Sequence, residues 1–461
     1  MKIFRKQNLK NLLSKASENK ERSLSALDLT LMSVGSVIGT GVMVLTGIVA
    51  AKQSGPATSV AFIGGGIAAA IIVLCYAEFS SSIPSAGGSY SFTYVSLGEI
   101  IAYIAGLCIV IGYTLSTATV ASGWGAYLMS LLNTLGIKLP KTFTAIPSDG
   151  GIVNLPAMLS ILLIVFIISL GTSESKRVND IMVFIKIAVI VLFIGVGAFH
   201  VNPSNWHPFA PFGTKGIITG TASLFFAYCG FDATASAAED VKNPQKALPL
   251  GLISSLIICT VIYIAVSLVL TGVTSYTNLD VGDALSYALK LTGENGVAFV
   301  VSLGTVIGIL AVIFAGNFTT SHILLAMSRD GLLPKPFSKV NKKDVPYVAL
   351  WTVGIIGAFL AGFFNLGQLA NFANIAFLLT YTLVCISLIA FRKKYPDVKR
   401  GFKTPLVPLI PILGAGSCLF LMANLTKETW IIFLVVLVIL IISYLIYGRK
   451  HSLVNEGNSN S

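Results

Sequence analysis

Charged residues are scarce in this sequence, and their scarcity excludes an ordinary water-soluble domain. Asp, Glu, Lys and Arg make up 11% of its 461 residues, whereas 55% of the residues are hydrophobic. A soluble domain is about 25% charged, so this chain has too few charges to cover a surface that faces water. Histidine is also rare, with four residues. Only His322 lies within an apolar segment, so we find no pattern for a histidine proton relay.

The sequence also lacks the cysteine patterns of a disulfide framework or a metal site. None of the six cysteines has CxxC spacing, and all of them lie inside apolar segments, at positions 75, 108, 229, 259, 385 and 418. We therefore expect small packing residues, with Cys229 set apart only by its place in an interrupted segment. We expect no catalytic residue, no metal and no cofactor.

Long apolar runs are what the sequence has instead. Runs of about 17–25 residues recur from end to end, each long enough to span a bilayer. We predict an all-α integral membrane protein with about twelve spans, near 26–50, 56–80, 97–130, 156–171, 178–199, 216–238, 248–272, 297–327, 347–364, 369–391, 405–424 and 429–448. The third and eighth spans are long enough to tilt strongly or to project beyond the bilayer.

The net charge of +12 follows the spans rather than a nucleic-acid footprint. If the N-terminus is cytoplasmic, 24 of the 31 Lys and Arg fall on the cytoplasmic side, six fall outside and Lys186 lies within a span. This bias obeys the positive-inside rule and places both termini in the cytoplasm of a cell-membrane protein. The polar N-terminal segment has no apolar core or cleavage site of a signal peptide.

The order of the spans suggests two related halves. The first and sixth spans are interrupted by glycine, and five spans run from each to the end of its unit. Because five is odd, the second unit would be inverted relative to the first. We expect a tail at 1–25, repeats at 26–200 and 216–391, two extra spans at 405–448 and a second tail at 449–461.

The first interruption runs through Ser36, Val37, Ile38, Gly39, Thr40 and Gly41. Glycine lets the backbone leave the helix and lets a ligand approach it closely. The half-helix that begins near Gly41 would point free N–H groups at an anion such as a carboxylate. The preceding half-helix would end in carbonyls that suit an ammonium group. Close packing of two helices on these glycines is an equal alternative.

The second interruption contains Tyr228, Cys229, Gly230 and Phe231. Free carbonyls of Phe226, Ala227 and Cys229 could receive the ammonium from the other side, although ordinary packing is commoner for any one aromatic residue here. The next residue, Asp232, could ligate a cation or cap the second half-helix, and we favour the cap.

Lys186 is the one Lys or Arg within a span. An ionisable residue at that depth indicates function by default, because burial of an unpartnered charge costs several kcal/mol. A desolvated lysine also releases its proton more readily, which suits proton coupling. The alternative is a lysine that snorkels to the nearby cytoplasmic face.

Three further polar positions lie near span ends or within spans. Glu78 could pair with a basic loop residue or contribute to an inner gate. The run from Thr319 to His322 could bind a ligand, but hydroxyls that bond back to their own helix are commoner. The segment 80–90 is rich in turn formers and predicts a short re-entrant or interfacial element.

Segments 39–41, 76–90, 225–244 and 327–331 resemble the amino acid–polyamine–organocation superfamily, and within it the cationic amino acid transporters and their bacterial proton-coupled relatives. The resemblance covers nearly the whole chain. It implies a five-plus-five inverted repeat with two further helices, and amino acid binding at both interruptions. The positions that match the family's site are Val37, Thr40, Gly41, Phe226, Ala227 and Cys229. Lys186 matches the lysine that replaces a sodium ion in proton-coupled relatives. Two positions depart from the family: Cys229 replaces a bulkier aliphatic residue, and His322 an arginine.

The sequence therefore predicts a secondary transporter that imports an L-amino acid, neutral or cationic, by proton symport with alternating access. Its partners would be the amino acid, the proton and the lipid bilayer, with no nucleic acid, and the sequence leaves open whether a small membrane subunit takes part. An amino acid or amine exchanger without net proton flux is the nearest alternative. A membrane enzyme fits less well, because the interruptions contain no nucleophile–base pair or metal-ligand cluster. A channel fits less well because the polar positions are local, and tight binding without transport would indicate a receptor.

Overall fold

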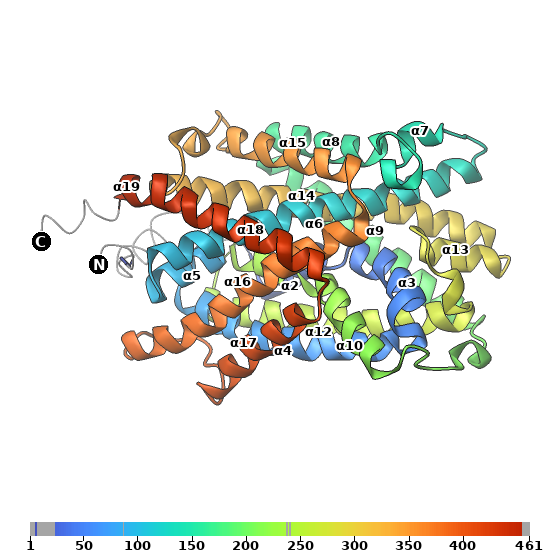
Figure 1. Cartoon of the computed structure of the whole chain (residues 1–461), viewed down its shortest axis with the longest axis horizontal. Coiled ribbons are helices and arrows are strands. Elements are labelled where there is room, and N and C mark those ends of the chain that lie inside the picture. The colour runs from blue at the N-terminus through green and yellow to red at the C-terminus, as the bar shows by residue number, and fades with distance from the viewer. Residues whose placement is uncertain (1–4, 7–23, 86, 237, 239–240, 454–461) are drawn as a thin grey trace, which may run out of the picture.

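The computed structural model describes residues 5–6, 24–85, 87–236, 238 and 241–453, which form a helical bundle with no β-strand (Figure 1). Within them, seven helical segments are long and apolar enough to cross a membrane: Gly41–Ser82, Glu99–Thr134, Asp180–Ala198, Pro244–Val273, Asn295–Arg329, Leu366–Lys394 and Lys427–His451. Four shorter apolar helices accompany them, Ala26–Val37, Leu155–Ser169, Tyr347–Phe363 and Leu409–Ala423. The chain is an all-α, multi-pass membrane protein, as predicted.

The main helical elements follow one another along the chain in this order: α2 (Ala26–Val37), η2 (Gly41–Leu45), α3 (Thr46–Val49), η3 (Ala50–Ser54), α4 (Thr58–Ser82), α5 (Gly88–Ser96), α6 (Glu99–Thr134), α7 (Lys141–Thr144), α8 (Leu155–Ser169), α9 (Thr172–Ala198), α10 (Gly213–Leu224), η7 (Phe225–Tyr228), α11 (Phe231–Ser236), α12 (Pro244–Val273), α13 (Ala284–Leu291), α14 (Asn295–Arg329), α15 (Tyr347–Phe363), α16 (Leu366–Lys394), α17 (Leu409–Ala423), α18 (Lys427–Ser443), η11 (Tyr444–Gly448) and α19 (Arg449–His451).

Several helices begin at side chains that take up their free N–H groups. Ser25 and Asp28 form a reciprocal capping box at the start of α2. Asn154, Asn365 and Thr426 each accept a hydrogen bond from the first turn of α8, α16 and α18. These caps satisfy donors that helix formation leaves unpaired, and they define where the elements begin.

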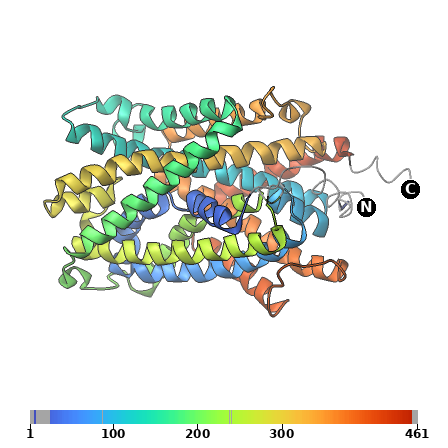
Figure 2. The same cartoon turned by 180° about the vertical axis from the view of Figure 1, so that it is seen from behind.

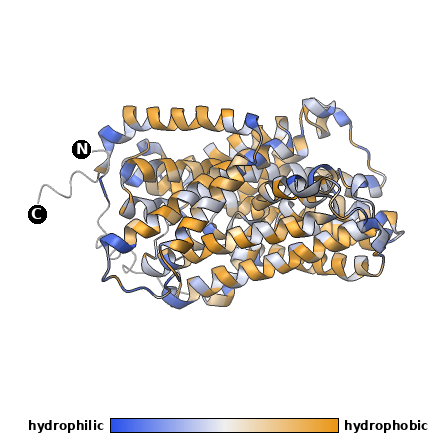
Figure 3. Cartoon of the chain, turned by 60° about the horizontal axis from the view of Figure 1, so that its bottom comes forward, coloured by the Kyte–Doolittle hydropathy of each residue, from blue (hydrophilic) through white to orange (hydrophobic). Residues whose placement is uncertain are grey.

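The exterior of the bundle is apolar along its length and polar at its ends. Figure 3 shows hydrophobic residues along the helices and hydrophilic residues gathered at the loops. Large side chains such as Phe184, Ile446 and Val261 are more than half exposed. In water such a surface would be unstable, whereas lipid tails cover it at no cost. Both ends of the described chain lie at the same end of the bundle, called here the terminal end (Figure 1).

The longest helices form the frame that holds the site. Helices α6 and α14 have 36 and 35 residues, so at 1.5 Å per residue they are about 54 Å and about 52 Å long, longer than a bilayer core. They pack along each other, α16 packs along α6, and α4 packs along α12. Figure 2 shows the short helix α2 in the middle of the bundle, with α9 and α12 on either side. The predicted great length of the third and eighth spans is confirmed.

A short buried helix follows α4 and overlaps the turn-forming segment 80–90, for which a short re-entrant or interfacial element was predicted. Helix α4 ends at Ser82, and α5 runs from Gly88 to Ser96 with every residue buried. It packs against α6, α16 and α11 at the terminal end. The element therefore supports α11, the helix that follows the second interruption.

Candidate functional site

The first interruption lies where the glycine pattern predicted it. Helix α2 ends at Val37, Ile38 has an extended backbone with φ −72° and ψ 105°, and helical structure resumes at Gly41. The residues from Val37 to Gly41 are all buried. Backbone groups are therefore released from the helix at a place without access to bulk water, where they need other partners.

Lys186 is the hydrogen-bond partner of two of these backbone groups. Its side chain on α9 is fully buried, and its ammonium group donates hydrogen bonds to the carbonyl oxygens of Gly35 and Ile38, the second at 2.7 Å. Both acceptors belong to the end of α2. The alternative of a snorkelling lysine is wrong, because the ammonium group reaches inward to the interruption rather than toward an exposed face.

The second interruption separates η7 from α11. Cys229 has an extended backbone, and Gly230 has φ +117°, a conformation that a residue with a Cβ rarely adopts. The Ser36 hydroxyl donates a hydrogen bond of 3.0 Å to the Gly230 carbonyl. The two interruptions thus contact each other directly, although 194 residues separate Ser36 from Gly230.

Tyr263 on α12 connects the two interruptions a second time. Its hydroxyl lies 2.7 Å from the Ala227 carbonyl oxygen and 3.2 Å from that of Val37, and it donates to both. The Phe226 carbonyl accepts from the Cys229 N–H at 3.1 Å. The expectation that the Phe226 and Ala227 carbonyls are free is therefore wrong in this conformation. Each oxygen keeps a second lone pair for a ligand.

A small cavity lies between the interruptions. It is lined by Ser36, Val37, Gly39, Thr40, Gly41, Ser116, Val120, Phe226, Ala227, Cys229 and Val312. Its volume is about 10 Å³, close to the minimum for one water molecule. The Thr40 hydroxyl is buried here without a hydrogen-bond partner among the described residues. A ligand larger than water requires the surrounding helices to move apart.

Most of the predicted site residues meet at this cavity. Ile38, Gly230 and Phe231 lie in the interruptions without lining it. Sequence reasoning missed Ser116 and Val120 on α6 and Val312 on α14. These residues lie within long apolar helices that carry no glycine or proline signal at those positions.

Asp232 is the second residue of α11, two residues beyond Gly230, which holds the N-cap position. Its carboxylate accepts hydrogen bonds of 2.9 Å from the hydroxyls of Tyr113 on α6 and Tyr381 on α16. The preferred interpretation as a helix cap is therefore incomplete, because the carboxylate joins α11 to two other helices.

Glu78 is the centre of an ionic cluster at the terminal end. Its fully buried carboxylate accepts hydrogen bonds of 2.7 Å from Arg392 Nε and Nη2 and from the Thr404 N–H, and Arg400 Nε lies 3.2 Å away. The interpretation that Glu78 pairs with basic residues is confirmed. The cluster fastens the chain between α16 and α17 to α4.

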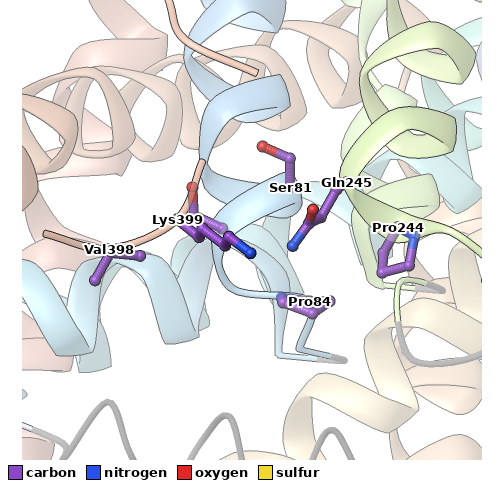
Figure 4. A pocket seen from close by; sticks show the side chains of 7 residues that line it. Ser81, Pro84, Pro244, Gln245, Val398 and Lys399 are labelled. Atoms are coloured by element: carbon purple, nitrogen blue, oxygen red, sulfur yellow. The ribbon is translucent and has the colours of Figure 1, made fainter. Parts of the chain in front are cut away.

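A larger cavity of about 300 Å³ lies beside this cluster (Figure 4). It is lined by Ser81, Ser82, Pro84, Pro244, Gln245, Val398 and Lys399. Lys399 and Gln245, both exposed, point toward each other across it. No residue of either interruption contributes to its lining, so its size does not make it the site.

The polar run in α14 is held by its own helix. The Thr320 hydroxyl donates to the Gly316 carbonyl at 2.6 Å, and the Ser321 hydroxyl donates to Phe318 at 2.8 Å. This outcome agrees with the commoner of the two interpretations. His322 Nδ1 also lies 2.8 Å from the Phe318 carbonyl.

Comparison with known proteins identifies the family to which the chain belongs. Residues 24–442 match the family model of amino acid permeases. The chain is 47% identical to the methylthioribose transporter of Bacillus subtilis over 98% of its length and 99% of that protein. It is 43% identical to the branched-chain amino acid permease BcaP of the same organism, with the same coverage. It is also 35% identical over 82% of its length to the vacuolar cationic amino acid transporter 4 of Arabidopsis thaliana, of which 64% is covered.

These relatives are transporters rather than enzymes, and the two interruptions lie where the resemblance of the sequence placed them. The chain belongs to the amino acid permease family of the amino acid–polyamine–organocation superfamily.

Proposed function

We propose that this protein is a cell-membrane secondary transporter that imports a neutral L-amino acid together with a proton by alternating access. The observation that carries the proposal is the cavity between the two interruptions, where the buried Thr40 hydroxyl has no hydrogen-bond partner among the described residues. Free backbone groups and a polar side chain at the same buried point match the needs of a zwitterion.

The proposed architecture has twelve spans. Helices α2 to η3 would form the first span, and α10 to α11 the sixth. The segments 26–200 and 216–391 would be inverted repeats, 405–448 would add two spans, and 1–25 and 449–461 would be cytoplasmic tails. The excess of Lys and Arg at the terminal end supports a cytoplasmic orientation.

In the proposed complex, the α-carboxylate lies at the start of η2, near Gly41 and the Thr40 hydroxyl. Helix N-termini attract anions through their free N–H groups and dipole. The α-ammonium lies between the ends of α2 and η7, within reach of carbonyls such as those of Val37 and Ala227. Gly39, Ile38, Phe226, Cys229, Gly230 and Phe231 complete the proposed binding segments.

The lining of the cavity favours a neutral side chain. None of its residues is charged, so a cationic side chain would be buried there without a partner. Val120, Val312 and Phe226 offer apolar contacts instead. The name of the branched-chain relative agrees with this choice.

Lys186 is the proposed link between the proton and the conformational change. When charged, it holds the end of α2 through the carbonyls of Gly35 and Ile38. Loss of its proton would weaken both hydrogen bonds, since charge-assisted hydrogen bonds are about twice as strong as neutral ones. The inner half of the first span would then be free to move.

Uptake of labelled leucine into proteoliposomes tests the proposal. We expect stimulation by an inward proton gradient in the parent and none in Lys186→Ala. Equal stimulation in both proteins would refute the coupling role. A strict requirement for internal amino acid, with no effect of the gradient, would indicate an exchanger.

Methylthioribose is a second candidate substrate, because the relative named for it is 47% identical over nearly the whole chain. It is a neutral molecule with a thioether group, which a cavity without charged residues can accept. Displacement of labelled leucine by unlabelled leucine but not by methylthioribose would favour the amino acid. The reverse result, with labelled methylthioribose taken up, would favour the sugar.

A further inference from the structure

The second interruption carries a buried acid that the proposed role of Lys186 does not use. Asp232 follows Gly230 and Phe231 directly, and its exposed fraction is 4%. It belongs to the same segment as Cys229, which lines the cavity. A carboxylate at such a depth is costly to maintain and indicates a function.

The surroundings of Asp232 provide hydrogen bonds but no countercharge. Tyr113 and Tyr381 both donate to the same oxygen, Oδ1, at 2.9 Å. The backbone N–H groups of Gly230 and Asp232 itself also interact with the carboxylate. In the part of the chain that the structure describes, no Lys, Arg or His forms an ion pair with it.

The other titratable groups that face Asp232 are neutral in their ordinary state. Tyr76 on α4 packs its ring edge-on against Phe231, and its hydroxyl is bonded to Ser89 of α5 at 2.7 Å. The thiol of Cys229 lies nearby on the same segment. Burial without a countercharge opposes the ionised carboxylate, whereas the four donors favour it.

We propose that Asp232 binds and releases a proton in each transport cycle, in addition to the proton exchange of Lys186; this inference rests on the proposed function. On the outer side the carboxylate gains one proton and becomes a neutral acid. On the inner side it returns that proton to water and becomes a carboxylate again. No other bond forms or breaks in this step, and the tyrosines keep their own protons.

The geometry explains how this proton changes the conformation. The ionised carboxylate holds α11 against α6 and α16 through two charge-assisted hydrogen bonds. Protonation removes the charge and weakens both, which loosens α11 from the frame. Because the Gly230 carbonyl accepts from Ser36, a movement of α11 also reaches the first interruption.

Proteoliposome transport of leucine by Asp232→Asn tests the inference. We expect this variant to retain counterflow of labelled leucine but to lose all stimulation by an inward proton gradient. Asp280→Asn is the matched control, because Asp280 is exposed and paired with Lys52 outside the site. The control should keep the parent's stimulation. The same stimulation in Asp232→Asn and the parent would overturn the proposal.

Two further variants keep the proposal testable if Asp232→Asn does not fold. Tyr113→Phe and Tyr381→Phe each remove one donor to Oδ1, so the pH profile of leucine uptake should shift in both. An unchanged profile in both would also overturn it. The proposed function fails in a different way, by a parent protein that moves leucine in neither uptake nor counterflow.

Discussion

Each of the two interruptions is held to neighbouring helices by a buried charged group, and the two groups are opposite in charge. At the first, the buried cation of Lys186 donates to backbone carbonyls that α2 releases. At the second, the buried anion of Asp232 accepts from the hydroxyls of Tyr113 and Tyr381. Each charged group fastens a half-helix to neighbouring helices, and neither belongs to an ion pair within the described chain.

The two interruptions are held in place by different kinds of hydrogen-bond partner. The partners of Lys186 are main-chain atoms, so the first interruption depends on where the backbone leaves the helix. The partners of Asp232 include side chains from α6 and α16, so the second depends on residues far away in the sequence. A proton added to Asp232, or lost from Lys186, weakens the corresponding attachment.

Substitution of Glu78 sharpens the contrast between a paired and an unpaired buried acid. Glu78→Ala leaves Arg392 and Arg400 without their carboxylate, and removal of one partner of a buried ion pair costs about 3–5 kcal/mol. We expect a clear fall in the melting temperature in detergent. Asp232→Asn should lower it less, because no cation is left unpaired.

Lys393→Ala is the control for this comparison, since Lys393 is exposed in the same region. It should melt like the parent. A Glu78→Ala variant that melts like the parent would show that the ionic cluster adds nothing to stability.

Substitution of Gly41 tests the direct contact between the interruptions. A Cβ at Gly41 would lie 2.5 Å from Ala227 Cβ and 2.6 Å from Ala227 Cα, so one backbone has to shift. Overpacking costs about 1–3 kcal/mol, and we expect uptake by Gly41→Ala to fall by on the order of 100-fold. Gly195→Ala is the control, because nothing lies within 4 Å of its added Cβ. Normal uptake by Gly41→Ala would show that the two segments are not closely packed in the working protein.

The sequence predicted the interruptions because their signals are local. Glycines inside an apolar span can be recognised without knowledge of any contact, and so can a single lysine such as Lys186. The resemblance to a known family then indicated which residues within the interruptions were candidates for binding the substrate. Helix lengths, caps and the all-helical class follow from the same short-range patterns.

The contacts across the bundle could not be predicted in this way. Tyr263 meets Val37 across 226 residues of sequence, and Tyr113 meets Asp232 across 119. A tyrosine in an apolar span has the same local pattern whether it packs or bonds to a carbonyl. Ser116 is one of many small residues along α6. Which of these residues make contacts across the bundle depends on how the long helices pack.

Removal of the Tyr263 hydroxyl breaks one of the connections between the two interruptions without changing either charge. Tyr263→Phe removes the donor that Val37 and Ala227 share, a hydrogen bond worth about 1 kcal/mol, or roughly fivefold in affinity. We expect a higher KM for leucine with unchanged stimulation by the proton gradient. Tyr228→Phe is the comparison, because its hydroxyl donates to Phe62 of α4 and does not bridge the interruptions. Equal KM values for the two variants would show that the bridge has no special role.

The smallest expected effect concerns Cys229, the cysteine of the second interruption, which lines the cavity. Cys229→Ala removes one heavy atom and so enlarges the part of the cavity that would hold the side chain of the substrate. A buried methylene is worth about 0.8 kcal/mol, which corresponds to roughly fourfold in affinity. We expect the preference for leucine over alanine, measured by competition against a labelled substrate, to rise by about that factor. Cys108→Ala removes an equally buried thiol from α6 that does not line the cavity, and it should leave the ratio unchanged. In the proposed complex, backbone groups hold the α-carboxylate and the α-ammonium, which leucine and alanine share. The substitution should therefore alter only the contact with the substrate's side chain. An unchanged ratio in Cys229→Ala would place the side chain of the substrate elsewhere, against α6 or α14 alone.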